Sequence, residues 1–307
     1  MGVTRRDFLS ATAGIFAGNA CWCSAQEPKM QQRGLEKVLV IGIDGLRPDA
    51  LLEATIPNID LLWTEGAYSF RARTGEYTVT APGWSNIFTG VWESKHGVKN
   101  NNFNGNSFEG ANYQKYPTIF TRIENYQPKL ETEVVASLDW LTERIITTAD
   151  KRIYHPFDEN GDMKVAETTV RLLQYNTIDL LFAYFEGVDV AGHNYGFDPK
   201  VQEYLSEIET IDHYVGILME AVTRRPNYTK EDWLTILISD HGGKGKSHDS
   251  VGEEAKKVPL IMHGPRVQKG EIVPVPRQVD IAPTILTYFG IPIRPEWGLD
   301  GTVVGLK

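Results

Sequence analysis

The sequence predicts an α/β fold in which helices cover both faces of a mostly parallel central sheet. Two observations support this prediction. Short apolar runs rich in β-branched residues recur along the chain, and longer segments with helical character separate them. Strands that alternate with helices connect by crossovers, which place consecutive strands in parallel. The predicted strands cover residues 37–43, 133–137, 178–185, 233–239 and 258–263.

The clearest predicted helix covers residues 201–222. Large apolar side chains recur there at three- and four-residue spacings, which places them on one helical face. They are Tyr204, Ile208, Ile211, Val215 and Leu218. No internal repeat is visible in the 307 residues. Residues 26–307 are long enough for one large α/β domain with a small cap or inserted loops.

The first residues of the chain have the pattern of an export signal. Arg5 and Arg6 precede a short, weakly apolar run that ends in the small residues of Cys23-Ser24-Ala25. We therefore predict a twin-arginine signal peptide over residues 1–25 and a periplasmic or extracellular mature protein without a transmembrane segment. A lipid anchor at Cys21 is an alternative, although the usual leucine before the cysteine is absent.

Removal of residues 1–25 would take away both cysteines and change the net charge from −9 to about −10. A metal in the mature protein would then depend on oxygen and nitrogen ligands. The acidic balance and the lack of a basic block argue against a nucleic-acid-binding surface. They remain compatible with a nucleotide as substrate.

Acidic residues and histidines follow three of the predicted strands. Asp44 comes directly after the first strand, and Asp240 and His241 come directly after the fourth. Asp189 follows the third strand, and His193 stands four residues further on, so one helical turn would place both on the same face. Open α/β sheets bind ligands outside the carboxyl ends of their strands, so we expect these side chains to converge.

His248, in a loop of glycine, lysine and serine, completes a set of three carboxylates and three imidazoles. Each member alone has an ordinary explanation, because an aspartate after a strand is usually a turn former or a helix cap. A loop histidine is also commonly a plain surface residue. Their joint occurrence favours two divalent metal ions with open coordination positions. Gly242 and Gly243, beside the pair after the fourth strand, are expected to let the backbone approach a ligand.

Thr80 is the candidate nucleophile. Pro82 suits the first turn of a helix through Thr89, which would leave Thr80 just ahead of the helix amino terminus, where free amides attract an anion. A divalent cation bound to the hydroxyl would favour the alkoxide. The spacing alone is equally typical of a threonine that only caps the helix.

These motifs and their order resemble the alkaline phosphatase superfamily, and within it the type I phosphodiesterase/nucleotide pyrophosphatase family. The resemblance runs from about Lys37 to Gly301. Its motifs are Ile43-Asp44-Gly45, Ile56-Pro57-Asn58-Ile59-Asp60, Thr80-x-Pro82, Phe88-Thr89-Gly90, Glu93-Ser94-Lys95-His96-Gly97, Asp189-x-x-Gly192-His193, Ser239-Asp240-His241-Gly242-Gly243 and Asp280-Ile281-Ala282-Pro283-Thr284.

The resemblance implies an alkaline phosphatase-like three-layer α/β/α fold and two metal sites beside the nucleophile. It also implies a threonyl-phosphate intermediate on Thr80. Zinc is the usual metal of the family, and manganese or another divalent ion is an alternative. The implied ligands are Asp189, His193 and His248 for one ion, and Asp44, Asp240, His241 and Thr80 for the other.

The resemblance also bears on the substrate. The diesterase branch has an asparagine about 21 residues beyond the nucleophile, and Asn101 stands at that distance, in a run of asparagines also typical of a turn. Asn101 would donate to a phosphoryl oxygen without adding charge. Related monoesterases add a lysine and an arginine in a Ser-x-Lys-Asp-Arg segment. The comparable stretch here, residues 137–141, reads Ser-Leu-Asp-Trp-Leu and has neither, which favours a diester or a pyrophosphate.

One departure from the family pattern leaves nucleotide specificity open. Thr80-Ala81-Pro82-Gly83-Trp84 replaces the Thr-Phe-Pro-Asn-His of eukaryotic nucleotide pyrophosphatases. Trp84, Trp140 and the stretch from Tyr113 to Tyr116 could stack a base or a sugar, although packing in the core is the commoner role of such aromatic residues. We predict an exported hydrolase of phosphodiester or pyrophosphate bonds in a small phosphate ester or nucleotide. A phosphomonoesterase on the same scaffold and a noncatalytic metal-dependent binding protein are the alternatives.

Overall fold

The computed structural model describes residues 35–105, 107–158, 160–175, 177–249 and 252–307. The signal peptide predicted over residues 1–25 lies outside these ranges, so it stays a prediction. Within the described ranges, none of the helices combines the length and the apolar character that crossing a bilayer requires.

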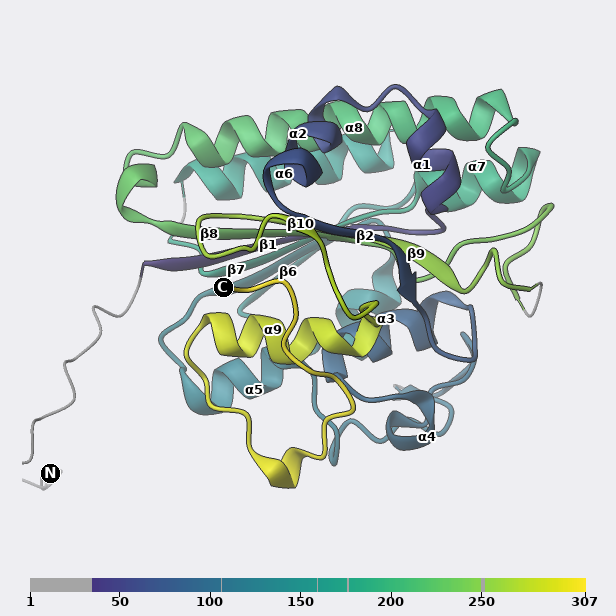
Figure 1. Cartoon of the computed structure of the whole chain (residues 1–307). Helices are drawn as coiled ribbons and strands as arrows, with labels where there is room; N and C mark the ends of the chain where they lie inside the picture. Colours follow the sequence, from purple (N-terminus) through teal and green to yellow (C-terminus); the bar gives the residue numbers. More distant parts are fainter. Residues whose placement is uncertain (1–34, 106, 159, 176, 250–251) are drawn as a thin grey trace, which may run out of the picture. The chain divides into compact units, whose positions relative to one another are not determined.

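An eight-stranded sheet forms the centre of the domain, in the order β10-β2-β9-β8-β1-β7-β5-β6 (Figure 1). Seven of these strands point the same way, and β9 runs antiparallel to both of its neighbours. The strands are β1 (Glu36–Ile43), β2 (Ala67–Arg73), β5 (Thr132–Ala136), β6 (Lys151–Tyr154), β7 (Leu180–Phe185), β8 (Asp232–Ile238), β9 (Lys257–His263) and β10 (Gly270–Glu271).

Helices cover both faces of the sheet and complete the three layers (Figure 1). One face carries α1 (Pro48–Glu53), α2 (Pro57–Glu65), α6 (Gly161–Tyr175), α7 (Gly187–Tyr195) and α8 (Gln202–Thr223). The other carries α3 (Thr80–Thr89), α4 (Glu93–His96), α5 (Ile119–Tyr126) and α9 (Ile281–Tyr288). An inserted loop between α4 and α5 contains the short pair β3 (Phe103–Asn104) and β4 (Ser107–Phe108).

The alternation of side chains along β1 divides the core into two parts. Val38 and Val40 pack in the cluster beneath α3, α5 and α9, whereas Leu39 and Ile41 pack in the cluster beneath α8. All four side chains are fully buried. A parallel strand covered on both faces needs apolar residues at every position, which explains the continuous apolar run in the sequence.

The predicted fold class is confirmed, and all five predicted strands form within two residues of their expected ends. In the central sheet, β2, β6 and β10 were not predicted, and neither was the short pair β3 and β4 outside it. Both β2 and β6 carry arginines, and β6 and β10 lie at the edges of the sheet, where one side of the strand faces solvent. Such strands lack the apolar run that marks a buried strand.

Candidate active site

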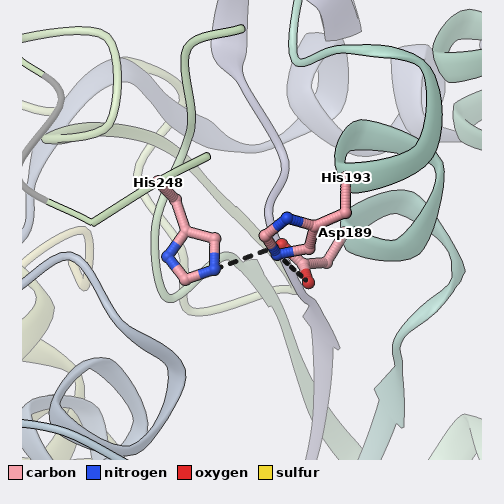
Figure 2. Close-up of side chains that lie close together, drawn as sticks. All are labelled: Asp189, His193 and His248. Carbon is pink, nitrogen blue, oxygen red and sulfur yellow. Dashed lines mark ion pairs between the residues drawn. The ribbon is translucent and has the colours of Figure 1, made fainter. Parts of the chain in front are cut away.

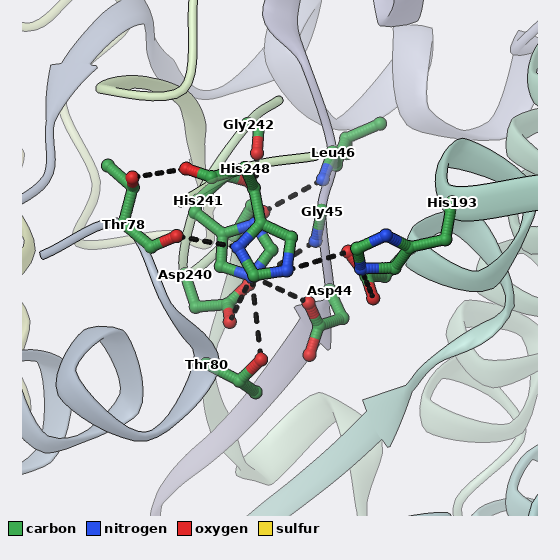
Figure 3. A network of polar contacts seen from close by, with 12 residues as sticks. Asp44, Gly45, Leu46, Thr78, Thr80, His193, Asp240, His241, Gly242 and His248 are labelled. Atoms are coloured by element: carbon green, nitrogen blue, oxygen red, sulfur yellow. Dashed lines mark hydrogen bonds and ion pairs between the residues drawn. The ribbon is translucent and has the colours of Figure 1, made fainter. Parts of the chain in front are cut away.

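The carboxyl ends of β8, β1 and β7 lie side by side and bring the predicted site residues together (Figure 3). At these ends, β1 pairs with β8 through Gly42 and Ile238, and with β7 through Ile43 and Phe185. The loops that carry the site side chains therefore leave the sheet from neighbouring points. Asp44 follows β1, Asp240 and His241 follow β8, and Asp189 and His193 lie on α7 after β7.

Gly45 makes the turn that lets α7 approach the end of β1. Its φ angle is +66°, and a Cβ atom there would lie 2.7 Å from Asp189 Oδ1. Its amide donates to Asp240 Oδ1 at 3.3 Å. Any other residue would be strained and would also push against Asp189, so glycine is needed for both reasons.

The first cluster consists of Asp44, Asp240 and His241, all fully buried. His241 Nε2 lies 3.2 Å from Asp44 Oδ1 and 3.4 Å from Asp240 Oδ2. Among the described residues, neither of these two oxygens has a hydrogen-bond partner. Buried oxygens without a partner are rare, and three ligand atoms that face one another in this way fit a divalent cation.

The second cluster consists of Asp189, His193 and His248 (Figure 2). His193 Nε2 lies 3.3 Å from Asp189 Oδ2, and His248 Nε2 lies 3.9 Å from Asp189 Oδ1. The latter oxygen is also buried without a hydrogen-bond partner in the described part of the chain. The two clusters adjoin, because the rings of His248 and His241 stack with centroids 3.8 Å apart.

Backbone carbonyls fix the tautomer of all three imidazoles. The Nδ1 atoms of His241, His248 and His193 lie 2.9, 2.7 and 3.0 Å from the carbonyl oxygens of Gly242, Thr78 and Lys246, respectively. A carbonyl can only accept, so each Nδ1 carries a proton, and a neutral ring presents the Nε2 lone pair to the carboxylates. This is the orientation of metal-bound histidines, whose second nitrogen donates to a fixed acceptor.

The electrostatics of the first cluster also fit a cation. Burial, followed by repulsion from neighbouring carboxylates, raises the pKa of Asp44 and Asp240 well above the usual range. Burial, followed by the nearby His248, lowers the pKa of His241 to about 3, so its ring is neutral at pH 7. A bound divalent ion would favour the ionised carboxylates and would leave the neutral imidazole as a ligand.

Thr80 is the first residue of α3, and Figure 3 shows its hydroxyl turned towards His241. Thr80 Oγ1 lies 3.5 Å from His241 Nε2. The sequence analysis placed Thr80 just ahead of the helix, which is wrong by one position. The helix begins earlier because the extended Val79 accepts the first helical hydrogen bond from the Gly83 amide. Pro82 still lies in the first turn, where its missing N–H costs no helical bond.

Asn101 lies beside the nucleophile candidate, as the sequence analysis expected. Its side-chain Oδ1 accepts the Ala81 amide at 2.9 Å. This contact satisfies one free N–H of the first turn of α3 and leaves the Asn101 NH₂ group as a donor next to Thr80.

One expectation about nearby residues needs correction, and one alternative is decided. A Cβ atom at Gly242 would meet the carbonyl oxygen of Glu254, and one at Gly243 would meet the ring of Phe197. These glycines therefore make room for other parts of the chain rather than for a ligand. Trp84 is fully buried and packs on Phe182, so it is a core residue and has no surface on which a base could stack.

Trp140 and Tyr113 are also engaged within the protein. Trp140 packs edge-on against Phe108, with ring centroids 5.3 Å apart. The Tyr113 hydroxyl lies 2.6 Å from Ser85 Oγ. Neither contact indicates a base-binding surface.

Sequence reasoning missed two residues that support the clusters. Tyr184 donates its hydroxyl to Asp44 Oδ2 at 2.5 Å. Asp162, on α6, accepts the backbone amides of Glu186 and Gly187 at 3.0 and 2.8 Å and thereby holds the start of the helix that carries Asp189. Tyr184 lies within the apolar run of β7, and Asp162 is one of several polar residues of an amphipathic helix. Neither position therefore stands out in the sequence as part of a site.

The profile of the type I phosphodiesterase/nucleotide pyrophosphatase family matches residues 38–255, which include every residue of both clusters. The chain belongs to this family. The residues to which the resemblance gives metal and nucleophile roles are among those that the fold brings together at the carboxyl ends of the strands.

Comparison with individual proteins agrees with the membership of the type I phosphodiesterase/nucleotide pyrophosphatase family. Ectonucleotide pyrophosphatase/phosphodiesterase family member 7 of Rattus norvegicus is 22% identical over 232 residues, which cover 69% of this chain and 51% of the relative. The chain spans about half the length of this protein and of its mouse and human counterparts.

Two solved structures share the fold. Murine ectonucleotide pyrophosphatase/phosphodiesterase 5 matches with a TM-score of 0.67 and 16% identity, covering 85% of this chain and 96% of that chain. A 2-O GAG sulfatase matches with a TM-score of 0.69 and 16% identity, covering 87% of this chain and 73% of that chain. Both likenesses support the alkaline phosphatase-like three-layer architecture.

Proposed function

We propose that this protein is an exported hydrolase of phosphodiester or pyrophosphate bonds that uses two divalent metal ions and a threonyl-phosphate intermediate. One observation carries the proposal. The Thr80 hydroxyl, at the amino terminus of α3, lies beside two adjoining groups of ligand atoms whose buried oxygens have no partner among the described residues. A nucleophile, an anion-attracting helix end and cation ligands would then act on one phosphate.

The proposed ligand sets are those of the two clusters. Asp189, His193 and His248 would hold one ion, and Asp44, Asp240 and His241 would hold the other, with Thr80 in contact with the second. Imidazole nitrogens and carboxylate oxygens suit zinc, which is our first choice of metal. Bound divalent ions would stabilise the ionised Thr80 hydroxyl and neutralise charge that develops on the phosphate.

The residues of the chain then have defined roles. Thr80 Oγ would form a bond to phosphorus while the bond to the leaving oxygen breaks, and water would later cleave the threonyl phosphate. Asn101 would donate its NH₂ group to a phosphoryl oxygen, since its Oδ1 is already held by Ala81. Burial of Thr80 and of both carboxylates of the first cluster would limit competing water.

The charges near the site favour a substrate with one negative charge at the reacting phosphate. At the two positions where related monoesterases have cations, this chain has Asp139, which is exposed, and Leu141, which is fully buried in the core. Burial, followed by repulsion from Asp162 and Asp189, raises the pKa of Glu186, just before α7, to about 8. These carboxyl groups would repel the second negative charge of a monoester dianion.

The test compares three substrates with the mature protein reconstituted with zinc. They are bis-p-nitrophenyl phosphate, thymidine 5′-p-nitrophenyl phosphate and p-nitrophenyl phosphate. Thr80→Ala is the test variant. Thr89→Ala is the matched control, because Thr89 is also buried in α3 but donates to the Ser85 carbonyl at the far end of the helix.

We expect faster turnover of the diesters, lost in Thr80→Ala and retained in Thr89→Ala. A faster reaction with the nucleotide diester than with the simple diester would indicate a base-binding pocket. Preference for the monoester would overturn the proposed substrate class. Equal turnover by Thr80→Ala and the wild type would refute the assignment of Thr80 as the nucleophile. A noncatalytic role would follow if the protein turned over none of the substrates with any divalent metal bound.

The proposed export depends on the paired arginines Arg5 and Arg6. Replacement of Arg5 and Arg6 by lysine should leave unprocessed protein in the cytoplasm of a host with a twin-arginine pathway. Normal processing of that variant would contradict export by this route.

A further inference from the structure

A buried amide joins the helix that carries Thr80 to the loop that carries Asp240. Gln278 lies in a 3₁₀ turn, Gln278–Asp280, and is fully buried. Its Nε2 donates to the carbonyl oxygens of Ser239 and Asp240 at 3.2 and 2.5 Å. Its Oε1 accepts from Asn86 Nδ2, on α3, at 3.4 Å. One side chain thus contacts both elements that meet at the first cluster.

Neighbouring hydrogen bonds fix the direction of both amides. The Val98 amide donates to His96 Nδ1 at 3.1 Å, so the proton of this ring is on Nε2, which donates to Asn86 Oδ1 at 2.9 Å. Burial lowers the pKa of His96 to about 3 and keeps the ring neutral. Asn86 must therefore present its NH₂ group to Gln278, and Gln278 must present its own NH₂ group to the loop.

The loop after β8 depends on this contact. β8 ends at Ile238, so the carbonyls of Ser239 and Asp240 lie beyond the last paired residue of the strand. Both residues are fully buried, and a buried carbonyl needs a donor. Gln278 supplies one donor group to both carbonyls.

The same loop also lies in direct contact with α3. A Cβ atom at Gly83 would lie 2.7 Å from the Asp240 carbonyl oxygen and 2.8 Å from Asp240 Cβ. The helix and the loop therefore touch at Gly83, and Gln278 bonds the same carbonyl from another element. A shift of that carbonyl would move the Asp240 carboxylate relative to Thr80.

We propose that Gln278 is a positioning residue, which sets the Asp240 carboxylate and the amino-terminal end of α3 in the arrangement needed for metal binding and for attack by Thr80. This inference rests on the proposed function, which it extends to a residue outside both clusters. Gln278 acts through the backbone of Asp240 and through Asn86, and it has no role as a ligand or as a proton donor to the substrate.

The test variant is Gln278→Met, which keeps the length of the side chain and removes the amide. Gln127→Met is the matched control, because Gln127 Nε2 also donates to a backbone carbonyl, that of Phe289, at 3.0 Å and outside the site. Zinc affinity, measured by competition with a chromophoric chelator, is the first readout. The second is the separate effect on kcat and KM for bis-p-nitrophenyl phosphate.

We expect Gln278→Met to weaken zinc binding by about 10-fold or more and to lower kcat by a similar factor, as loss of an outer-shell partner does at other metal sites, with KM nearly unchanged. The control should match the wild type in both. Wild-type zinc affinity and kcat in Gln278→Met, with only a lower Tm, would overturn the proposal.

Two further outcomes are separable. If wild-type protein binds zinc but shows no Thr80-dependent turnover, the proposed function fails, and the zinc affinity of Gln278→Met still decides the role of Gln278. If Gln278→Met does not fold, Gln278→Asn, which keeps the amide but is one methylene too short to reach all three partners, is judged by the same two readouts.

Discussion

Replacement of Asp240 by asparagine is expected to stabilise the metal-free protein and to destabilise the zinc-loaded protein. Asp240 Oδ1 accepts the Gly45 amide, whereas Oδ2 lies 3.4 Å from the Nε2 lone pair of His241 and has no hydrogen-bond partner in the described ranges. Asparagine can keep the first contact and can donate its NH₂ group to His241. The substitution therefore replaces an unpartnered buried oxygen by a hydrogen-bonded amide, and it also removes a proposed ligand.

The two opposite effects have different sizes. Without metal, removal of the unpartnered group should gain about 1–3 kcal/mol, and each 1 kcal/mol raises the Tm of a domain of this size by about 2–4 °C. With free zinc at about 1,000 times Kd, each occupied site stabilises by about 4 kcal/mol, or about 8–16 °C. Loss of one site in the variant should outweigh the gain and reverse the sign of the Tm difference.

The pH dependence gives a second check. Burial, followed by repulsion from Asp189, raises the pKa of folded Asp240 above its unfolded value, so the folded protein binds more protons. In the metal-free wild type, the stability that Asp240 contributes should be full below about pH 4, the pKa of an unfolded aspartate, and should be lost as the pH rises towards the folded pKa. The asparagine variant should show a weaker decline.

Thermal unfolding with a chelator and with zinc, from pH 5 to pH 9, would measure both effects. Asp60→Asn is a matched control, because Asp60 is exposed and lies on α2, in neither cluster. It should change neither curve. A fall in Tm of Asp240→Asn both with chelator and with zinc would refute the reasoning, because it would mean that the ionised carboxylate stabilises the fold without a cation.

Three further substitutions have expected outcomes. Asn101→Ala should lower kcat for bis-p-nitrophenyl phosphate by about 10²-fold at unchanged zinc affinity, and intact turnover would remove its proposed phosphate contact. Tyr184→Phe removes the donor to Asp44 and should weaken zinc binding by about 10-fold in a chelator competition. An unchanged zinc affinity would mean that Tyr184 contributes only packing and does not support the metal site. Gly83→Ala should lower kcat, because the new methyl group pushes α3 away from Asp240. A lower Tm with wild-type kcat would contradict this.

The sequence was sufficient to predict the meeting of the two clusters. Asp44 and Asp240 directly follow apolar runs that could only be buried parallel strands, and the ends of such strands meet at one edge. The positions of Asp189 and His193 followed from helical spacing, and α7 confirms that geometry. The metal-ligand and nucleophile roles remain proposals.

Other parts of the site could not be predicted, because they depend on contacts between distant segments. Gln278 reaches Asp240 across 38 residues, and Tyr184 reaches Asp44 across 140. Trp84 illustrates the same limit, since its ring fills space above Gly42, where a Cβ atom would lie 2.4 Å from it. The sequence left base stacking and core packing both open for Trp84, and its burial against Gly42 and Phe182 decides for the core.

The attachment of the three imidazoles to main-chain oxygens has a consequence for how this protein can change. The acceptor for His193 is the carbonyl of Lys246, whose side chain is exposed and takes no part in that bond. A substitution at Lys246 would keep this carbonyl acceptor, whereas the other two acceptors, Thr78 and Gly242, are buried or have no room for a side chain. Under the proposed metal-ligand roles, variation of the Lys246 side chain would leave metal affinity unchanged, provided that the backbone path is kept.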